Sequence, residues 1–137
     1  MTDIQVAAAA QRLIDAAYNL GDTSKGFDCL SAIIEFYGNL GVKFPSEYEG
    51  FTLENYAAKW NAGEGREEFL DFLLEIGSEV DTHFERAGDL MVFEAGESVF
   101  PGIYLGSGNM LCAFEKGVMV LPFKFYQRSL IACRRLV

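Results

Sequence analysis

The chain has 137 residues, half of them apolar, and a formal net charge of −9 at pH 7. This length supports one domain with a substantial core, which we take as residues 1–137. The acidic balance argues against nucleic acid and against an anionic membrane surface as partners, because both attract clustered Lys and Arg.

The beginning of the sequence shows no secretory signal. It reads MTDIQVAAAAQRLIDAAYNLG, with no basic start, and Gln11, Arg12 and Asp15 interrupt the alanine run. We therefore expect a protein that is cytoplasmic as synthesised, with no membrane span. Three cysteines without a CxxC spacing and a single histidine predict neither a disulfide framework nor a metal site, and we expect no cofactor.

The first part of the chain predicts three amphipathic helices, each with apolar residues at helical spacing. These helices are expected over residues 3–18, 28–40 and 66–80. Asp28 or Ser24 is the expected N-cap of the second helix, and Gly41 its end. A further short helix is expected over residues 53–60, within an aromatic-rich segment.

After residue 86 the sequence changes to short β-rich runs separated by glycine-containing turns. The runs are GDLMVFEAG, GIYLGSGN, MLCAFEKG, VMVLPFKF and SLIACRRLV. GSGN at 106–109 predicts a hairpin turn, because no helix follows it and no Lys-Ser/Thr is present for a phosphate loop. Helices over about 1–80 followed by about five strands over about 87–137 predict an α+β domain with segregated layers.

Cys29 lies at the start of the second predicted helix, in SKGFDCLSAIIEF. Unpaired N–H groups and the helix dipole stabilise a thiolate at such a position and lower its pKa. The competing interpretation is a small core side chain, since free cysteine is among the most buried residue types.

The residues around Cys29 resemble the signature of the NlpC-like cell-wall peptidases. That signature is a Tyr, a Gly-containing loop and then Gly-x-Asp-Cys, and Tyr18, Gly21, Gly26 and Asp28 fall in register with it. Four further segments match the family in the correct order: LGVKFP, AGDLMVF, GIYLGSGNMLCAF and YQRSLIACRRLV. The resemblance implies a papain-like α+β core. It also implies hydrolysis of amide bonds in peptidoglycan stem peptides by a Cys-His-polar triad.

The same register departs from the family at two of the three triad positions. Cys29 matches the nucleophile, but Phe100 stands where the family has its general base, in His-x-Gly-Ile-Tyr. Cys112 stands at the third, orienting position, which is usually His. A cysteine protease needs a base to hold the thiolate and to protonate the leaving amine, and Phe can do neither. His83, the only histidine, lies before the first strand of this register and is interpreted as a loop residue.

Two other site residues are implied by the resemblance. Tyr18 matches a residue that borders the active-site cleft, and Asp28 matches an Asp that we interpret as structural. Residues 66–137 look closest to the members found in phage tails and gene transfer agents. That similarity implies other phage tail proteins as partners and incorporation into a phage particle.

Three functions remain open from the sequence. The first is a non-catalytic NlpC-like domain with a structural or assembly role in a phage or prophage tail. The second is an active cysteine peptidase that cleaves peptidoglycan stem peptides through Cys29, with a base not yet identified. The third is an intracellular protein-binding module unrelated to phage.

Overall fold

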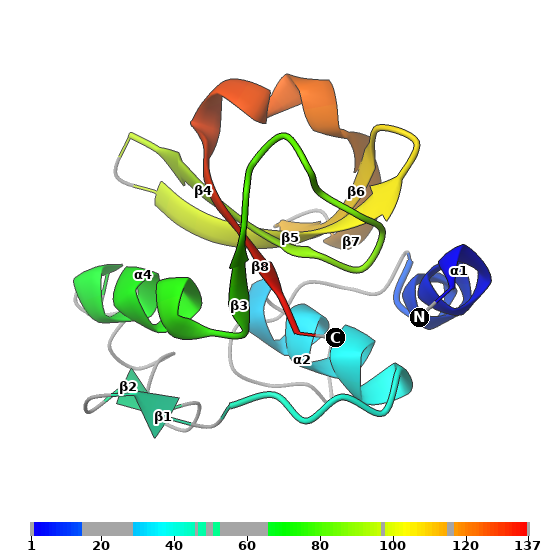
Figure 1. Ribbon diagram of the computed structural model, residues 1–137, viewed down its shortest axis with the longest axis horizontal. Coiled ribbons are helices and arrows are strands. Elements are labelled where there is room, and N and C mark those ends of the chain that lie inside the picture. Colours follow the sequence, from blue (N-terminus) through cyan, green and yellow to red (C-terminus); the bar gives the residue numbers. More distant parts are fainter. Residues whose placement is uncertain are drawn as a thin grey trace.

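The computed structural model describes residues 2–14, 29–45, 47–48, 51–52, 66–96, 98–114 and 117–136. Within them, three helices lie against an antiparallel sheet, which confirms the predicted α+β class (Figure 1). The helices are α1 (Asp3–Gln11), α2 (Cys29–Asn39) and α4 (Arg66–Glu75). None of the helices in these ranges is long and apolar enough to cross a membrane.

The main sheet has six strands in the order β3-β8-β4-β5-β6-β7, and every neighbouring pair is antiparallel. Its strands are β3 (Ser78–Val80), β4 (Leu90–Ala95), β5 (Ser98–Gly106), β6 (Asn109–Phe114), β7 (Gly117–Pro122) and β8 (Leu130–Arg135). The five predicted strands are β4 to β8. Two short 3-10 helices, η1 (Phe123–Phe125) and η2 (Gln127–Ser129), connect β7 to β8, and β1 (Glu47–Tyr48) pairs separately with β2 (Phe51–Thr52).

The third helix is shorter than predicted, and its expected last turn belongs to the sheet. α4 ends at Glu75, and residues 78–80 form β3 rather than helix. The reason lies at Gly77, which has a φ of 63°. A Cβ at Gly77 would overlap the backbone carbonyl oxygen of Arg135. Glycine therefore lets the chain turn sharply out of the helix and pair at once with β8.

The first helix, predicted over residues 3–18, ends at Gln11, and residues 15–18 of that range lie outside the described residues. A capping box between Thr2 and Gln5 starts it, with each side chain accepting a hydrogen bond from the other residue's backbone N–H. It ends at Gln11, after which the N–H of Leu13 donates to the carbonyl of Ala10, a spacing of three residues. The tighter spacing ends the α-helical pattern.

The second helix agrees with its predicted bounds. Gly41 follows it with a φ of 75°, and the N–H groups of Leu40 and Val42 both donate to the carbonyl of Tyr37. This is a glycine-terminated helix end of the expected kind. The predicted N-cap and the predicted short helix over 53–60 lie outside the described residues.

The predicted hairpin turn at 106–109 is confirmed. Gly106 pairs with Asn109, and the two residues between them, Ser107 and Gly108, have φ angles of 53° and 77°. Positive φ at both central positions is the geometry that suits the twist of a two-residue hairpin.

Side chains alternate along the strands between two buried clusters on opposite faces of the sheet. On β4, Leu90 and Val92 belong to one cluster, whereas Met91 and Phe93 belong to the other. The helix-side cluster joins the sheet to α1, α2 and α4, which lie together on one side in Figure 1. The aromatic cluster lies on the face covered by η1 and η2, and its buried members are Met91, Phe93, Met110, Cys112, Phe123 and Cys133.

Candidate active site

The helix that carries the candidate nucleophile begins one residue after the predicted start at residue 28, which itself lies outside the described residues. α2 starts at Cys29 and packs on β5 and β6. Its buried residues Leu30, Ile33, Phe36 and Tyr37 all belong to the helix-side cluster. The side chain of Cys29 lies outside the described part of the structure, as do Tyr18 and Asp28, so the roles assigned to these three residues stay predictions.

Tyr37 ties α2 to the sheet through a buried hydrogen bond. Its hydroxyl donates to the backbone carbonyl of Gly88 at 2.7 Å, just before β4. Burial, followed by the nearby Asp89 carboxylate, raises the pKa of this hydroxyl well above its usual value. The neutral hydroxyl therefore acts as a fixed donor that holds the segment just before β4 against α2.

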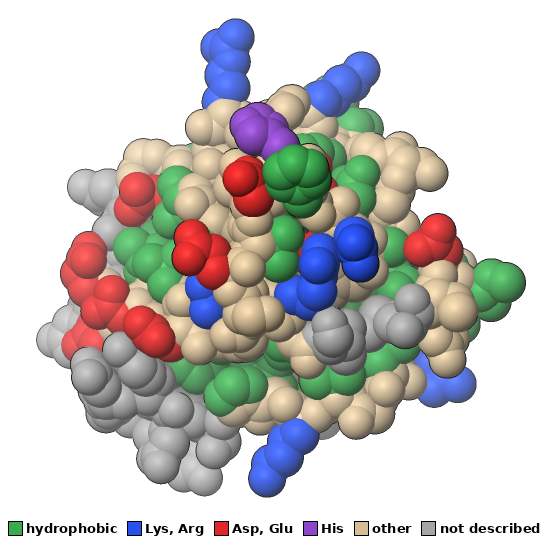
Figure 2. All heavy atoms as spheres, in the orientation of Figure 1, with side chains coloured by type: hydrophobic (Ala, Val, Ile, Leu, Met, Phe, Trp, Pro, Cys, Tyr) green, Lys and Arg blue, Asp and Glu red, His purple; other side chains and the backbone are tan. Residues whose placement is uncertain are grey.

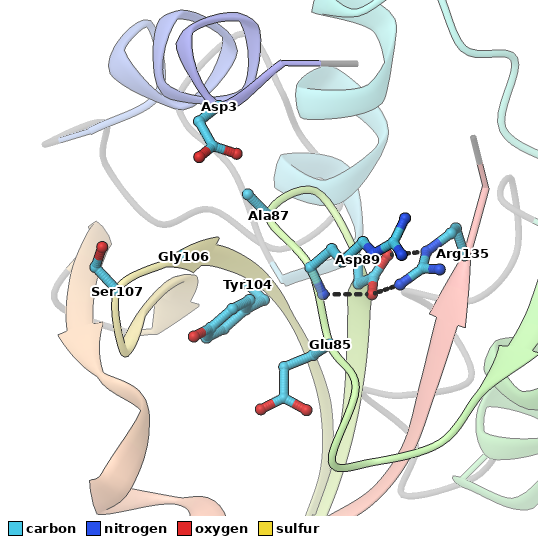
Figure 3. A pocket seen from close by; sticks show the side chains of 9 residues that line it. Asp3, Glu85, Ala87, Asp89, Tyr104, Gly106, Ser107 and Arg135 are labelled. Carbon is cyan, nitrogen blue, oxygen red and sulfur yellow. Dashed lines mark hydrogen bonds and ion pairs between the residues drawn. The ribbon is translucent and has the colours of Figure 1, made fainter.

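Asp89 is the buried charged residue of the described core, and Arg135 neutralises it. The Asp89 carboxylate accepts hydrogen bonds from Nε and Nη2 of Arg135 at 2.8 and 2.7 Å, and from the N–H of Arg86 at 2.8 Å (Figure 3). The pKa of Arg135 is raised, chiefly by its hydrogen bond to Asp89. A two-pronged contact of this kind fixes both partners. It joins the start of β4 to the end of β8.

The contact between Asp89 and Arg135 was not predicted from the sequence. Both residues lie in segments that carried the family resemblance, the Gly-Asp-Leu motif and the terminal Arg-Arg pair. Two charges of opposite sign, at the ends of neighbouring strands, are the signal that could have suggested the pairing.

Phe100 lies half-buried on β5 in an aromatic environment. Its ring stacks on Phe93 with centroids 5.0 Å apart and meets Phe114 and Tyr126 edge-on at 5.3 and 5.6 Å. Such contacts favour an apolar ring over a charged imidazolium. The structure therefore places Phe100, the position predicted to match the family's base, against the aromatic cluster.

Cys112 lies on β6 in the same cluster and is buried. A Cβ built on Gly102 would lie 3.0 Å from the Cys112 sulfur and 3.4 Å from the Phe93 ring. Since Ile103 pairs with Leu111, Cys112 lies across from Gly102, one diagonal step from Phe100. The structure therefore brings Phe100 and Cys112, the two positions that the sequence register assigns to the triad, together on one face of adjacent strands.

Phe100 and Cys112 do not lie on the face of the sheet that α2 covers. Phe100 and Cys112 pack in the aromatic cluster, whereas the buried side chains of α2 pack in the helix-side cluster on the other face. Convergence of Cys29 with the pair thus remains a prediction from the sequence register.

His83 lies in an exposed turn between β3 and β4, at residues 81–84. Its backbone N–H donates to the Asp81 carboxylate at 3.2 Å. In the described part of the chain, no group of three or more His, Cys, Asp or Glu residues could hold a metal ion.

A polar pocket of about 430 Å³ lies beside the Asp89–Arg135 pair. Figure 3 shows Tyr104 at its centre, with Asp3 of α1 on one side and Ser107 of the hairpin on another. The Tyr104 hydroxyl accepts a hydrogen bond from the N–H of Gly108 at 3.2 Å. The pocket is thus formed by α1, the segment before β4 and the β5–β6 hairpin, and among its described lining residues there is neither Phe100 nor Cys112.

The sequence profile of the NlpC/P60 family matches residues 15–135, which is most of the chain. The chain belongs to the NlpC/P60 family. No curated protein matches it in sequence. The predicted papain-like, NlpC-type α+β core is confirmed by the family match together with the fold.

Solved structures of the family have the same fold. An NlpC/P60 family protein from Bacillus cereus aligns with a TM-score of 0.68 at 21% identity, over 99% of this chain and 40% of that protein. The NlpC/p60 domain of the peptidoglycan hydrolase SagA aligns with a TM-score of 0.64 at 18% identity, over 98% of this chain and 99% of that domain. The P60 domain of an antigen from M. avium subspecies paratuberculosis aligns with a TM-score of 0.67 at 20% identity, over 98% of this chain and 94% of that domain.

At these identities the similarity establishes the fold alone. The chain spans less than half the length of the Bacillus cereus protein. What the whole relatives do is therefore carried to this chain only as a proposal.

Proposed function

We propose that this chain is a non-catalytic NlpC/P60 domain. The observation that carries the proposal is the environment of the base-equivalent position: Phe100 is packed among Phe93, Phe114 and Tyr126. The family register offers no other imidazole as the base. The sequence has one histidine, His83, and it lies in an exposed turn.

The chemical consequence is the loss of both steps that a base performs. Without an imidazolium partner the Cys29 thiol is not held as a thiolate ion pair, and the leaving amine is not protonated. Loss of the base from such a unit typically lowers the rate by several orders of magnitude. A position at the start of α2 favours a thiolate, but a helix dipole contributes at most about 2 kcal/mol.

The alternative is an active cysteine peptidase that acts on peptidoglycan stem peptides. It is supported by the placement of Cys29 at the first residue of α2. It requires a base that the family register does not provide.

Digestion of purified peptidoglycan sacculi separates these two functions. The wild-type protein and Cys29→Ser are incubated with sacculi, and released peptides are measured by mass spectrometry beside an active NlpC/P60 hydrolase. We expect no release above the Cys29→Ser background. Release that disappears in Cys29→Ser would establish the active peptidase instead.

We further propose that the domain has a structural or assembly role in a phage or prophage tail. Support comes from the resemblance of residues 66–137 to the phage-tail and gene-transfer-agent members. Mass spectrometry of purified particles from a host that carries the gene tests this role. A stoichiometric amount of the chain in tails supports it, and absence from the particles contradicts it.

A further inference from the structure

The outer edge of β8 is covered along only part of its length. Ser78–Val80 of β3 pairs with Cys133–Arg135, and the chain then turns away at residue 81. Among the described strands, Leu130–Ala132 therefore has no partner on the β3 side. An open strand edge of this kind presents backbone N–H and C=O groups that another chain can pair with.

The same stretch of β8 contains an irregularity that exposes an apolar side chain. β4 pairs Val92 with Ala132 and Phe93 with Leu130, so Ile131 is skipped. Ile131 is 42% exposed. A bulge in a strand redirects its side chain, and here it directs an isoleucine to the surface next to the open edge.

A groove of about 680 Å³ lies along this edge. Leu74, Val80 and Ile131 contribute apolar side chains to it, and the exposed carboxylates of Glu79 and Asp81 lie on its rim. The lining is mainly polar, and its apolar side chains lie beside an open strand edge, so an extended segment could make both backbone pairing and a limited side-chain contact there.

Arg134 also lines the groove, and it is held at the end of α4. Its Nε and Nη2 donate to the carbonyl oxygens of Ile76 and Gly77 at 2.7 and 3.0 Å. The C-terminal carbonyls of a helix attract a cation, so these two bonds direct one side of the guanidinium toward α4.

The surroundings of the groove are acidic. Exposed Glu68, Asp71 and Glu75 line the outer face of α4, which precedes β3 directly. Figure 2 shows acidic side chains gathered on the side of the molecule where Figure 1 places α4. A segment that enters this groove is therefore favoured if it carries positive charge.

We propose that the open edge of β8 at Leu130–Ala132 binds an extended, basic segment of a partner protein by strand addition. The segment lies antiparallel to β8 and continues the line of β3. Its backbone pairs with β8, one side chain packs on Ile131, and a Lys or Arg lies beside Glu79 and Asp81. The site is separate from the candidate active site and does not depend on whether the domain is catalytic.

A second copy of this chain fits the edge less well. Two copies that paired here would bring Glu79 and Asp81 of one against the same acidic rim of the other, on chains that each carry a formal charge of −9. Like charges brought together across an interface oppose association.

The test uses the intact, isotopically labelled chain and three synthetic probes. The first is acetyl-Thr-Lys-Val-Lys-Val-Thr-amide, the second has Glu in place of both Lys, and the third has both Val amides N-methylated. We expect the first peptide to shift the amide resonances of Leu130, Ile131 and Ala132, and the other two to bind at least about tenfold more weakly, or ~1.4 kcal/mol. Equal binding of the Lys and Glu peptides, or binding without shifts at these amides, would overturn the proposal.

A matched pair of charge reversals completes the experiment. Glu79→Lys lies on the rim of the groove, whereas Glu35→Lys reverses an exposed charge on α2. We expect Glu79→Lys to weaken the Lys peptide roughly fivefold and Glu35→Lys to change it less than twofold, since exposed ion pairs contribute up to ~1 kcal/mol each. Equal effects of the two variants, or dimerisation of the wild type through the β8 edge, would contradict a basic peptide as the occupant.

Discussion

Asp89 and Arg135 form a two-pronged ion pair that closes the sheet between the start of β4 and the end of β8. The Asp89 side chain is 3% exposed and the Arg135 side chain 26%. The same carboxylate also accepts a hydrogen bond from the N–H of Arg86, so one buried group fixes the turn before β4 and ties it to β8. This pair gives a structural reason for the Gly-Asp-Leu motif and for the arginines at the end of the chain, whether or not the domain is an enzyme.

Removal of the Asp89 charge should destabilise the fold. Asp89→Asn leaves the Arg135 guanidinium without its counter-charge in a largely buried site, and such a loss typically costs 3–5 kcal/mol. Because Arg135 is partly exposed, we expect a loss of about 2–4 kcal/mol in the free energy of unfolding, measured with urea. Asp71→Asn, on the exposed face of α4, is the control and should change it by less than about 0.5 kcal/mol. Equal changes in the two variants would show that the Asp89–Arg135 pair adds no more to the free energy of unfolding than an exposed carboxylate does.

The hydroxyl of Tyr37 should contribute measurably to the docking of α2. In Tyr37→Phe, the buried carbonyl of Gly88 loses its donor, and an unsatisfied buried group costs about 1–3 kcal/mol. Tyr126→Phe is the matched control, since the Tyr126 hydroxyl makes no hydrogen bond within the described residues. Thermal and urea unfolding of the two variants should differ by at least about 1 kcal/mol. A Tyr37→Phe protein as stable as wild type would contradict this role.

The buried Cys133 thiol should make the protein less stable in alkali. Burial, then Glu85 and Asp89, raise its pKa from 9.0 to about 12. Above pH 9 the unfolded chain loses this proton while the folded chain keeps it, so stability falls as pH rises toward 12. From pH 8 to pH 10 the expected loss from this group is about 1.4 kcal/mol.

Comparison with Cys133→Ala isolates that contribution. The variant loses the thiol, so its unfolding free energy should fall about 1.4 kcal/mol less than that of wild type over the same pH range. Other groups that titrate there are shared by both proteins and cancel. Parallel pH profiles would show that the thiol ionises as readily in the folded state as in the unfolded state.

Two glycines with nearly the same φ angle allow the cost of backbone strain to be compared with the cost of steric overlap. Gly77 and Gly96 have φ angles of 63° and 61°, but only a Cβ at Gly77 would overlap the Arg135 backbone, whereas nothing lies within 4 Å of one at Gly96. Gly96→Ala should cost about 1 kcal/mol from the backbone angle, and Gly77→Ala at least about 2 kcal/mol more, from overpacking. Urea unfolding measures both. Equal costs would mean that the α4–β3 junction relaxes freely.

The sequence predicted those features that depend on local pattern. Helix α2 with the glycine that follows it, the five strands after residue 86 and the hairpin at Ser107–Gly108 follow from apolar spacing and glycine placement. The end of α4 and strand β3 could not be found this way, because Gly77 approaches Arg135, a residue far along the chain. The apolar run continued through 66–80 without showing that its last residues pair with β8.

The candidate active site was predicted less completely than the fold. Motif register placed Phe100 and Cys112 on adjacent strands, and the structure finds them on one face. The sequence could not show that this face is the one opposite the helices. A side chain's face follows from the register of the whole sheet, which only the six paired strands define.

Restoration of the two missing imidazoles tests the triad register itself. If Phe100 and Cys112 occupy the base and orienting positions, Phe100→His with Cys112→His should bring an imidazole within about 3–4 Å of the Cys29 sulfur. The imidazolium would then lower the thiol pKa by ion pairing. The measurement is the rate of Cys29 alkylation against pH, with Cys29→Ser in the same background to subtract other thiols.

The double variant must first be shown to fold, because both positions lie in the aromatic cluster. Two apolar side chains there become polar, at an expected cost of roughly 1–3 kcal/mol, which circular dichroism and urea unfolding will measure. Peptidoglycan cleavage need not return, so the alkylation profile is the deciding measurement. A folded double variant with an unchanged alkylation profile would mean that the aromatic cluster and Cys29 lie apart across the sheet. In that case Phe100 and Cys112 are core residues, and the inactivity proposed for this domain would rest on the lack of any histidine near α2 rather than on a decayed triad.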